Sequence, residues 1–182
     1  FHLAENTESL LSDLMMAVRR FGIPKRFYTE NGAAFRSHHL RLVAAKMRIA
    51  LPHTPPYKPQ GRGKIERFFR SLRDGFLTGR PKSTLRKLNT DLAEWVDLYH
   101  QSIHSALDMS PINRKLVDQG RPLEQIDLAQ NINDLFRMET AKKVGSDGCI
   151  RMWGTRFEVR DAYPGETIRI YYLPWARDYL LC

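Results

Sequence analysis

The chain has 182 residues, a formal net charge of +9 with a pI near 9.8, and a hydrophobic fraction of 42%. This length fits one large domain or two small ones, and the positive charge favours a polyanionic partner. The sequence has no signal peptide and no apolar run of membrane length, so cytoplasmic residence is expected. Cys149 and Cys182 are distant and form no CxxC pair, so neither a disulfide framework nor a zinc site is predicted.

The first fifty residues alternate helical and extended patterns. Apolar residues at helical spacing predict helices, and short apolar runs predict strands; the helices are expected at 6–21 and 38–47, and the strands at 26–29 and 49–51. The first strand stops at Glu30, and Asn31-Gly32 predicts a tight turn because both residues tolerate positive φ. The order of helix, strand, helix and strand indicates an α/β layer architecture.

Two longer helices follow a loop at residues 52–63, which holds four prolines and two glycines. The expected helices cover 63–77 and 85–101. Each has an apolar stripe that predicts burial in the core, with Ile65, Phe69, Leu72 and Phe76 on the first and Leu85, Leu88, Leu92, Trp95 and Tyr99 on the second.

The last third of the chain changes in character. Residues 111–133 form a predicted linker, in which Ser110-Pro111 can start one short helix. From residue 134 onward, glycine turns separate short alternating runs, and Ile168, Ile170 and Tyr172 share one face of a strongly β-prone segment. Four or five short strands in about fifty residues indicate a small SH3-like β-barrel.

Two acidic residues occupy positions that suit metal-dependent chemistry. Glu30 follows a strand, and Glu66 lies in the first turn of a later helix, with 35 residues between the two glutamates. Phosphoryl transfer on DNA can use two divalent ions, and Mg²⁺ or Mn²⁺ prefers carboxylate oxygens. Each residue also has a simpler explanation, since Glu30 fits a solvated turn and Glu66 favours the helix dipole. The combination of spacing, turn and loop-helix motif favours the metal-binding interpretation.

The stretch around Glu66 resembles a known family signature. Tyr57, Pro59, Gln60, Gly63 and Glu66 resemble the Tyr-x-Pro-Gln-x-x-Gly-x-x-Glu pattern of the DDE transposase and retroviral integrase superfamily. The segment from Pro52 to Phe69 looks closest to bacterial insertion-sequence transposases, and His104-Ser105-Ala106-Leu107 is similar to the stretch that closes their catalytic core. Residues from about 134 onward look like the small barrel of Mu-type transposases.

The resemblance implies a fold, an activity and partners. The expected fold is the latter part of a ribonuclease H-like integrase core at residues 1–110, then the linker at 111–133 and the small all-β barrel at 134–182. The implied activity is cleavage and transfer of DNA strands at transposon ends. The implied cofactor is Mg²⁺ or Mn²⁺, and the implied partners are double-stranded DNA at the transposon ends and target, and further copies in a homo-oligomer. The protein is expected to be bacterial and nucleoid-associated.

The chain departs from the family pattern at two acidic positions. The resemblance makes Glu30 and Glu66 the second and third acidic metal ligands and catalytic residues, but the family has aspartate where Glu30 stands. The first acidic ligand belongs to a strand that is expected before Phe1. The substitution of glutamate for aspartate predicts weakened or shifted metal binding, since one extra methylene moves a carboxylate by about 1.5 Å.

Basic residues after Glu66 are the main candidates for DNA contacts. Lys and Arg outnumber acidic residues ten to two between Lys58 and Lys87. Arg70 and Arg73 share the helical face of Glu66, and the resemblance implies that they hold the transposon end. The further DNA-binding candidates are Asn31, Tyr57, Gln60, Arg62 and Lys64.

Two alternatives remain open from the sequence. A DNA-binding remnant that has lost its metal site would keep the basic helix and bind DNA ends without cutting them. A ribonuclease H-like nuclease without transposition is the other alternative, against which the barrel-like end of the chain argues. Metal titration distinguishes the first alternative from an active enzyme, and a strand-joining assay distinguishes the second.

Overall fold

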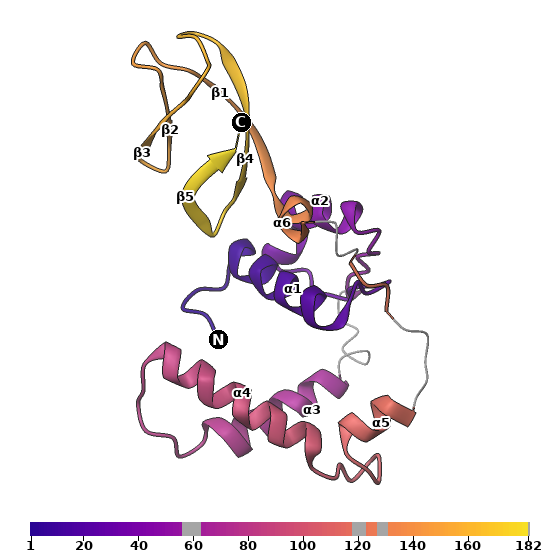
Figure 1. Cartoon of the computed structure of the whole chain (residues 1–182). Coiled ribbons are helices and arrows are strands. Elements are labelled where there is room, and N and C mark those ends of the chain that lie inside the picture. The colour runs from indigo at the N-terminus through magenta and orange to yellow at the C-terminus, as the bar shows by residue number, and fades with distance from the viewer. Residues whose placement is uncertain (56–62, 118–122, 127–130, 182) are drawn as a thin grey trace. The chain divides into compact units, whose positions relative to one another are not determined.

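The computed structural model describes residues 1–55, 63–117, 123–126 and 131–181 (Figure 1). The chain forms two compact units. The helical unit consists of Phe1–Ala4, Tyr28–Asn31 and Pro52–Leu123, and the mixed unit consists of Glu5–Phe27, Gly32–Leu51 and Glu124–Cys182.

Helix α1 of the mixed unit, Thr7–Phe21, confirms the first predicted helix. At its start the Asn6 side chain accepts a hydrogen bond from the Ser9 N–H at 2.8 Å. At its end Gly22 has φ 93°, a value that favours glycine, and its N–H donates to the Val18 carbonyl at 2.9 Å. Backbone groups that a helix end leaves without partners are thus satisfied at both ends.

The core of the mixed unit lies between α1 and two shorter helices (Figure 1). Helix α2, His38–Lys46, follows the 3₁₀ turn η1, Ala34–Arg36, and begins after Ser37, whose hydroxyl accepts from the Leu40 N–H. Helix α6 covers Ile132–Phe136. Buried apolar side chains from all three helices form one cluster, with Leu11, Val18, Leu40, Val43 and Phe136 at 2% exposure or less. Full burial of each such side chain stabilises the fold by about 1.5–3 kcal/mol.

The β-rich end of the mixed unit consists of two sheets among the residues described. Strands β1 (Met138–Lys143), β4 (Thr167–Leu173) and β5 (Ala176–Leu181) form an antiparallel sheet in the order β1-β4-β5, and β2 (Cys149–Met152) pairs only with β3 (Thr155–Glu158). The predicted SH3-like barrel is therefore not confirmed, because the described strands form no closed sheet. Side chains join the sheets instead: Ile150 and Met152 of β2 pack with Ile170 of β4.

Helices dominate the helical unit. Helix α3, Gly63–Leu72, continues into the π-helix η3, Arg73–Leu77, where the Thr78 N–H donates to the Arg73 carbonyl five residues earlier at 2.9 Å. Helix α4, Leu85–Gln101, and helix α5, Pro111–Val117, follow. The predicted helices at 63–77 and 85–101 and the short helix after Ser110 are all present, although the first changes its hydrogen-bonding pattern at Arg73.

The predicted core stripe of α3 is partly wrong. Leu72 and Phe76 are buried, but Ile65 and Phe69 are 48% and 52% exposed. The face of α3 that packs on α4 includes Phe68, whose ring lies 6.4 Å from Trp95 and 5.5 Å from Tyr99 between centroids. The helix is therefore rotated toward Phe68, because this ring meets the aromatic stripe of α4. That stripe is half-buried, so its predicted burial in the core is confirmed only in part.

The two short strands predicted before residue 52 are present only as isolated bridges. In the mixed unit Arg26 pairs in parallel with Ala50, and in the helical unit Thr29 pairs in parallel with His53. Within the ranges that the structure covers, the first 137 residues contain no multi-stranded sheet. The parallel direction nevertheless agrees with an α/β arrangement, in which helices connect parallel strands.

Candidate nucleic-acid and metal site

The backbone around Glu30 is held by hydrogen bonds to residues 52–54. The Thr29 N–H donates to the Pro52 carbonyl at 3.1 Å, and the Thr54 N–H donates to the Thr29 carbonyl at 2.8 Å. The Thr54 hydroxyl also donates to the Thr29 carbonyl, at 3.2 Å. Thr29 and Thr54 are buried, whereas Glu30 is exposed. The chain thus fixes the residue before Glu30 and presents the Glu30 side chain at the surface.

The side chains of His53 and Asn31 add hydrogen bonds on both sides of Glu30. The Nδ1 atom of His53 lies 3.0 Å from the Thr29 hydroxyl and 3.1 Å from the Glu30 carbonyl oxygen. The Asn31 amide donates to the Thr54 carbonyl at 2.7 Å. Residues 29, 30 and 31 are each contacted by His53 or Thr54, so the position of Glu30 depends on the segment at residues 52–54. Neither His53 nor Thr54 was singled out from sequence.

Helix α3 places the other acidic candidate beside basic residues. Glu66 lies in the first turn of α3, and Arg70 follows it by four residues on the same face. Arg73 begins η3, seven residues after Glu66. All three side chains are exposed, as is that of Lys64. Glu30 and Glu66 belong to the same compact unit.

Several predicted contacts lie outside the described residues. These are Tyr57, Gln60 and Arg62, which belong to residues 56–62. The two glutamates, Asn31, Lys64, Arg70 and Arg73 are the site candidates that the structure describes.

The described residues do not form a complete metal site. Across residues 1–55, 63–117, 123–126 and 131–181, no group of three or more His, Cys, Asp or Glu side chains could hold a metal ion. Glu30 and Glu66 have the oxygen chemistry that Mg²⁺ prefers. Two carboxylates nevertheless fall short of the three-carboxylate set that the family resemblance implies, so these residues alone do not fit a two-metal centre.

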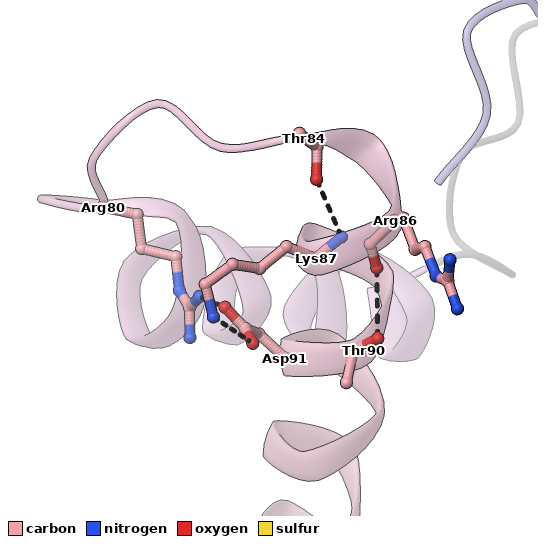
Figure 2. A network of polar contacts seen from close by, with 6 residues as sticks. All are labelled: Arg80, Thr84, Arg86, Lys87, Thr90 and Asp91. Carbon is pink, nitrogen blue, oxygen red and sulfur yellow. Dashed lines mark hydrogen bonds and ion pairs between the residues drawn. The ribbon is translucent and has the colours of Figure 1, made fainter.

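Ion pairs join the segment between η3 and α4 to helix α4, as Figure 2 shows. Asp91 of α4 pairs with Arg80 at 2.7 Å and with Lys87 at 3.2 Å. The Arg80 guanidinium also lies over the ring of Phe76, 4.0 Å from its centroid. The hydrogen bond from Arg80, followed by that from Lys87, lowers the pKa of Asp91 below its usual value. Arg80 therefore links the end of the basic helical segment to α4.

The start of α4 is fixed within the same network (Figure 2). The Thr84 hydroxyl accepts from the Lys87 N–H at 3.3 Å and caps the helix. One turn later the Thr90 hydroxyl donates to the Arg86 carbonyl at 3.1 Å. The spacing of Thr84 before an apolar run is a cap signal that is readable from sequence, whereas the pairing of Arg80 with Asp91 is not.

Comparison with known sequences identifies relatives over most of the chain. Residues 47–111 match the family described as Integrase core domain. The transposase for transposon Tn552 from Staphylococcus aureus is 34% identical over 188 residues, which cover 88% of the chain and 38% of that protein. The Gag-Pro-Pol polyproteins of simian retrovirus SRV-1 and Mason-Pfizer monkey virus are each 30% identical over 91 residues, which cover 50% of the chain and 4% of each polyprotein.

A solved structure has a similar fold. It is a chain in the cryo-EM structure of the simian T-cell lymphotropic virus intasome in complex with PP2A regulatory subunit B56 gamma, with a TM-score of 0.53 and 15% identity. The similarity covers 98% of the present chain and 62% of that chain. Together these findings support the assignment of the chain to the DDE transposase and integrase superfamily, as its motifs predicted. The chain spans less than two thirds of the relatives that it matches first.

Within the described ranges, no helix is both long and apolar enough to cross a bilayer.

Proposed function

We propose that this chain contributes two acidic ligands and a DNA-binding helix to a transposase that cleaves and joins DNA strands at transposon ends. The family matches support a transposase-like or integrase-like function in general terms. The observation that carries the finer proposal is the occurrence of Glu30 and Glu66 in one compact unit, with Glu66 on a helix that also carries Arg70 and Arg73. The metal would be Mg²⁺ or Mn²⁺, which would supply charge neutralisation at the reacting phosphate.

In this proposal the chain's own residues have separate roles. Glu30 and Glu66 provide carboxylate oxygens as two of the three acidic ligands that the family resemblance implies. Arg70 and Arg73 bind backbone phosphates of the transposon end, since guanidinium groups pair well with phosphate. Further contacts to DNA come from Asn31, Lys64 and the motif residues Tyr57, Gln60 and Arg62.

The remaining parts of the proposal concern organisation. The catalytic core ends near residue 110, residues 111–133 are a linker, and residues 134–182 form the β-rich part of the mixed unit. The active form is a homo-oligomer on double-stranded transposon ends and target DNA in a bacterial nucleoid. The intasome named in the structural match supports the expectation of an assembly on DNA.

A strand-joining assay on the natural protein that carries this sequence tests the proposal. Labelled transposon-end duplex and target duplex are incubated with Mg²⁺ or Mn²⁺, and with a chelator in parallel. We expect joined product only with metal, and none from a Glu66→Gln variant. Asp74→Asn is the matched control, because Asp74 is the other exposed acidic residue on the same helical segment. Equal joining by the two variants would contradict the role of Glu66.

A second candidate function is a DNA-binding remnant without catalysis. The observation that favours it is Glu30 in the place of aspartate, together with the lack of a three-ligand group among the described side chains. Such a protein would bind transposon ends with the same affinity with and without metal, and it would give no cleaved strand at any metal concentration. Binding and cleavage measured across one Mn²⁺ titration distinguish the two functions.

A further inference from the structure

Helix α3 borders a cavity that shares only Lys64 with the proposed metal and DNA site. The cavity has a volume of about 570 Å³ and is lined by side chains from three places in the helical unit. The residues that matter most are Lys64, Arg67 and Phe68 from α3, Tyr99 from α4, and His104 and Leu107 from the segment after α4. Its volume falls within the range of pockets that hold small organic ligands.

The apolar wall of the cavity consists of aromatic rings held by their neighbours. The rings of Phe68 and Tyr99 meet edge to face, with centroids 5.5 Å apart. Tyr99 is also stacked on Trp95 at 5.4 Å with an interplanar angle of 24°. Contacts on two sides restrict the rotamer of Tyr99, so the wall is formed before any ligand binds. Preformed walls reduce the entropic cost of binding.

His104 adds a polar group of defined tautomer. Its Nδ1 atom accepts a hydrogen bond from the Ala106 N–H at 3.3 Å, so the proton of the neutral ring is on Nε2. Backbone hydrogen bonds fix the segment, because the His104 N–H donates to the Met109 carbonyl at 3.0 Å and the Leu107 N–H donates to the His104 carbonyl at 2.8 Å. The ring therefore offers one hydrogen-bond donor, Nε2–H.

Two basic side chains line the cavity beside its aromatic wall. Lys64 and Arg67 are exposed and three residues apart on α3, so they share one face with Phe68. Within the part of the chain that the structure describes, neither side chain forms an ion pair. Both side chains line the cavity that an anionic ligand would enter.

This face of α3 differs from the face that carries Glu66. At about 100° per residue, the mean direction of Lys64, Arg67 and Phe68 is roughly half a turn away from that of Glu66, Arg70 and Arg73. A ligand in the cavity would therefore bind on the side of the helix away from Glu66, Arg70 and Arg73.

We propose that this cavity binds one unpaired nucleotide, with its base against Phe68 and Tyr99 and its phosphate near Lys64 and Arg67. Aromatic side chains beside cations are the combination that binds single-stranded nucleic acid, because every base has an apolar face and every phosphate has a negative charge. The Nε2–H of His104 can donate to a base or phosphate oxygen. The nucleotide comes from an unpaired DNA strand or from the free nucleotide pool.

Fluorescence anisotropy with short oligonucleotides tests this proposal independently of strand joining and without metal. The probes are a labelled single strand, an abasic strand of equal length and a blunt duplex. We expect the single strand to bind about tenfold more tightly than the abasic strand. Phe68→Leu should remove most of this preference while it keeps the apolar volume. Arg67→Gln should weaken both strands and lower the salt slope of binding by about one.

The control is Arg114→Gln, an exposed arginine of α5 outside the cavity, which should leave the preference for the strand with bases unchanged. Arg70→Gln should weaken the duplex and also leave that preference intact, so failure of the proposed end binding is distinguishable from failure of the cavity proposal. Adenosine monophosphate that displaces the single strand identifies the free nucleotide as the ligand, and no displacement identifies the DNA strand.

Three results would overturn the proposal. The first is an unchanged preference in Phe68→Leu, checked for native circular dichroism. The second is equal binding of the single strand by Arg67→Gln and Arg114→Gln. This comparison does not depend on the folding of Phe68→Leu. The third is displacement of the single strand by an acidic peptide as readily as by a second oligonucleotide, which would make the cavity a site for acidic protein segments.

Discussion

Replacement of the buried His39 should destabilise the mixed unit in a pH-dependent way. His39 lies on α2, is 7% exposed, and its Nε2 atom is 2.9 Å from the Phe136 carbonyl oxygen at the end of α6. A carbonyl only accepts, so Nε2 donates and this hydrogen bond connects two helices that are distant in sequence. His39→Leu removes the donor at similar volume and leaves the carbonyl without it. Loss of one partner of a buried hydrogen bond costs about 1–3 kcal/mol of unfolding free energy.

The sign of the pH dependence follows from burial. Desolvation lowers the pKa of His39 in the folded state below its ordinary value, despite the opposing hydrogen bond to Phe136. Between the folded and unfolded pKa values the unfolded chain binds more protons, so stability rises with pH. The contribution of His39 to the wild-type free energy of unfolding should be constant above about pH 7 and should fall as the pH drops through about 6.5, the unfolded value. His39→Leu should lack this part of the acid loss.

Urea unfolding at a series of pH values measures both effects, with hydrogen exchange in α2 and α6 as the local readout. The matched control is His38→Leu, the same substitution at the exposed neighbouring histidine. The reasoning is refuted if the two variants lose equal stability at neutral pH. It is also refuted if His39→Leu keeps the full acid slope of the wild type.

Four further predictions concern the site and its supports. Glu30→Asp should raise Mn²⁺ affinity and strand joining in the natural protein, and equal activity would count against the proposed misfit of the longer side chain. His53→Ala should displace the Glu30 peptide and therefore weaken metal binding more than DNA binding. His53→Asn restores a polar atom near Nδ1 and should recover part of the lost metal affinity. If His53→Asn recovers none of it, His53 has only a packing role. The double variant Arg70→Gln, Arg73→Gln should reduce the salt slope of end binding by about two, whereas an unchanged slope would exclude phosphate contacts by these residues. Asp91→Asn should increase the rate of proteolysis between residues 78 and 84 at neutral pH. The proteolysis rate of wild type should approach that of the variant only as the pH falls through the lowered pKa of Asp91. Equal rates at neutral pH would show that the ion pairs of Asp91 do not restrain this connection.

Helices were predictable from sequence because their signals are local. Asn6, Gly22 and Thr84 are capping residues that act within one turn of the helix ends. The direction of burial on α3 was less predictable. An apolar stripe through Ile65 is compatible with the helical period, but the aromatic side chains of α4 select the face that contains Phe68. The choice depends on a partner helix, which the period alone does not reveal.

The β-rich end illustrates a similar limit. Strand-forming segments were recognisable from alternation, as the half-buried and buried Ile168, Ile170 and Tyr172 show. Closure into a barrel required pairings between strands far apart in sequence. The β2–β3 hairpin is closed by Trp153 and Gly154, both at positive φ, and it pairs with itself alone among the described strands.

The candidate site was predictable only for its charged residues. The motif marks Glu66, and the spacing marks Glu30. The supports of Glu30 were not apparent, because Thr29 meets His53 across 24 positions through a parallel bridge. Such a register is set by tertiary packing, and an isolated histidine or threonine carries no sequence signal for it.

The π-helical turn at Arg73–Leu77 has a consequence for natural variation in chain length. A π turn equals an α-helix with one inserted residue. In a regular α-helix an inserted residue would rotate everything after it by about 100°, whereas the wider π turn takes up the extra residue locally. Phe76 thereby keeps its place beside Trp95, 5.9 Å away between ring centroids, and Arg80 reaches Asp91. Homologues with one residue fewer between the glutamate of the motif and the tryptophan should therefore have a regular α-helical turn here and keep this aromatic contact.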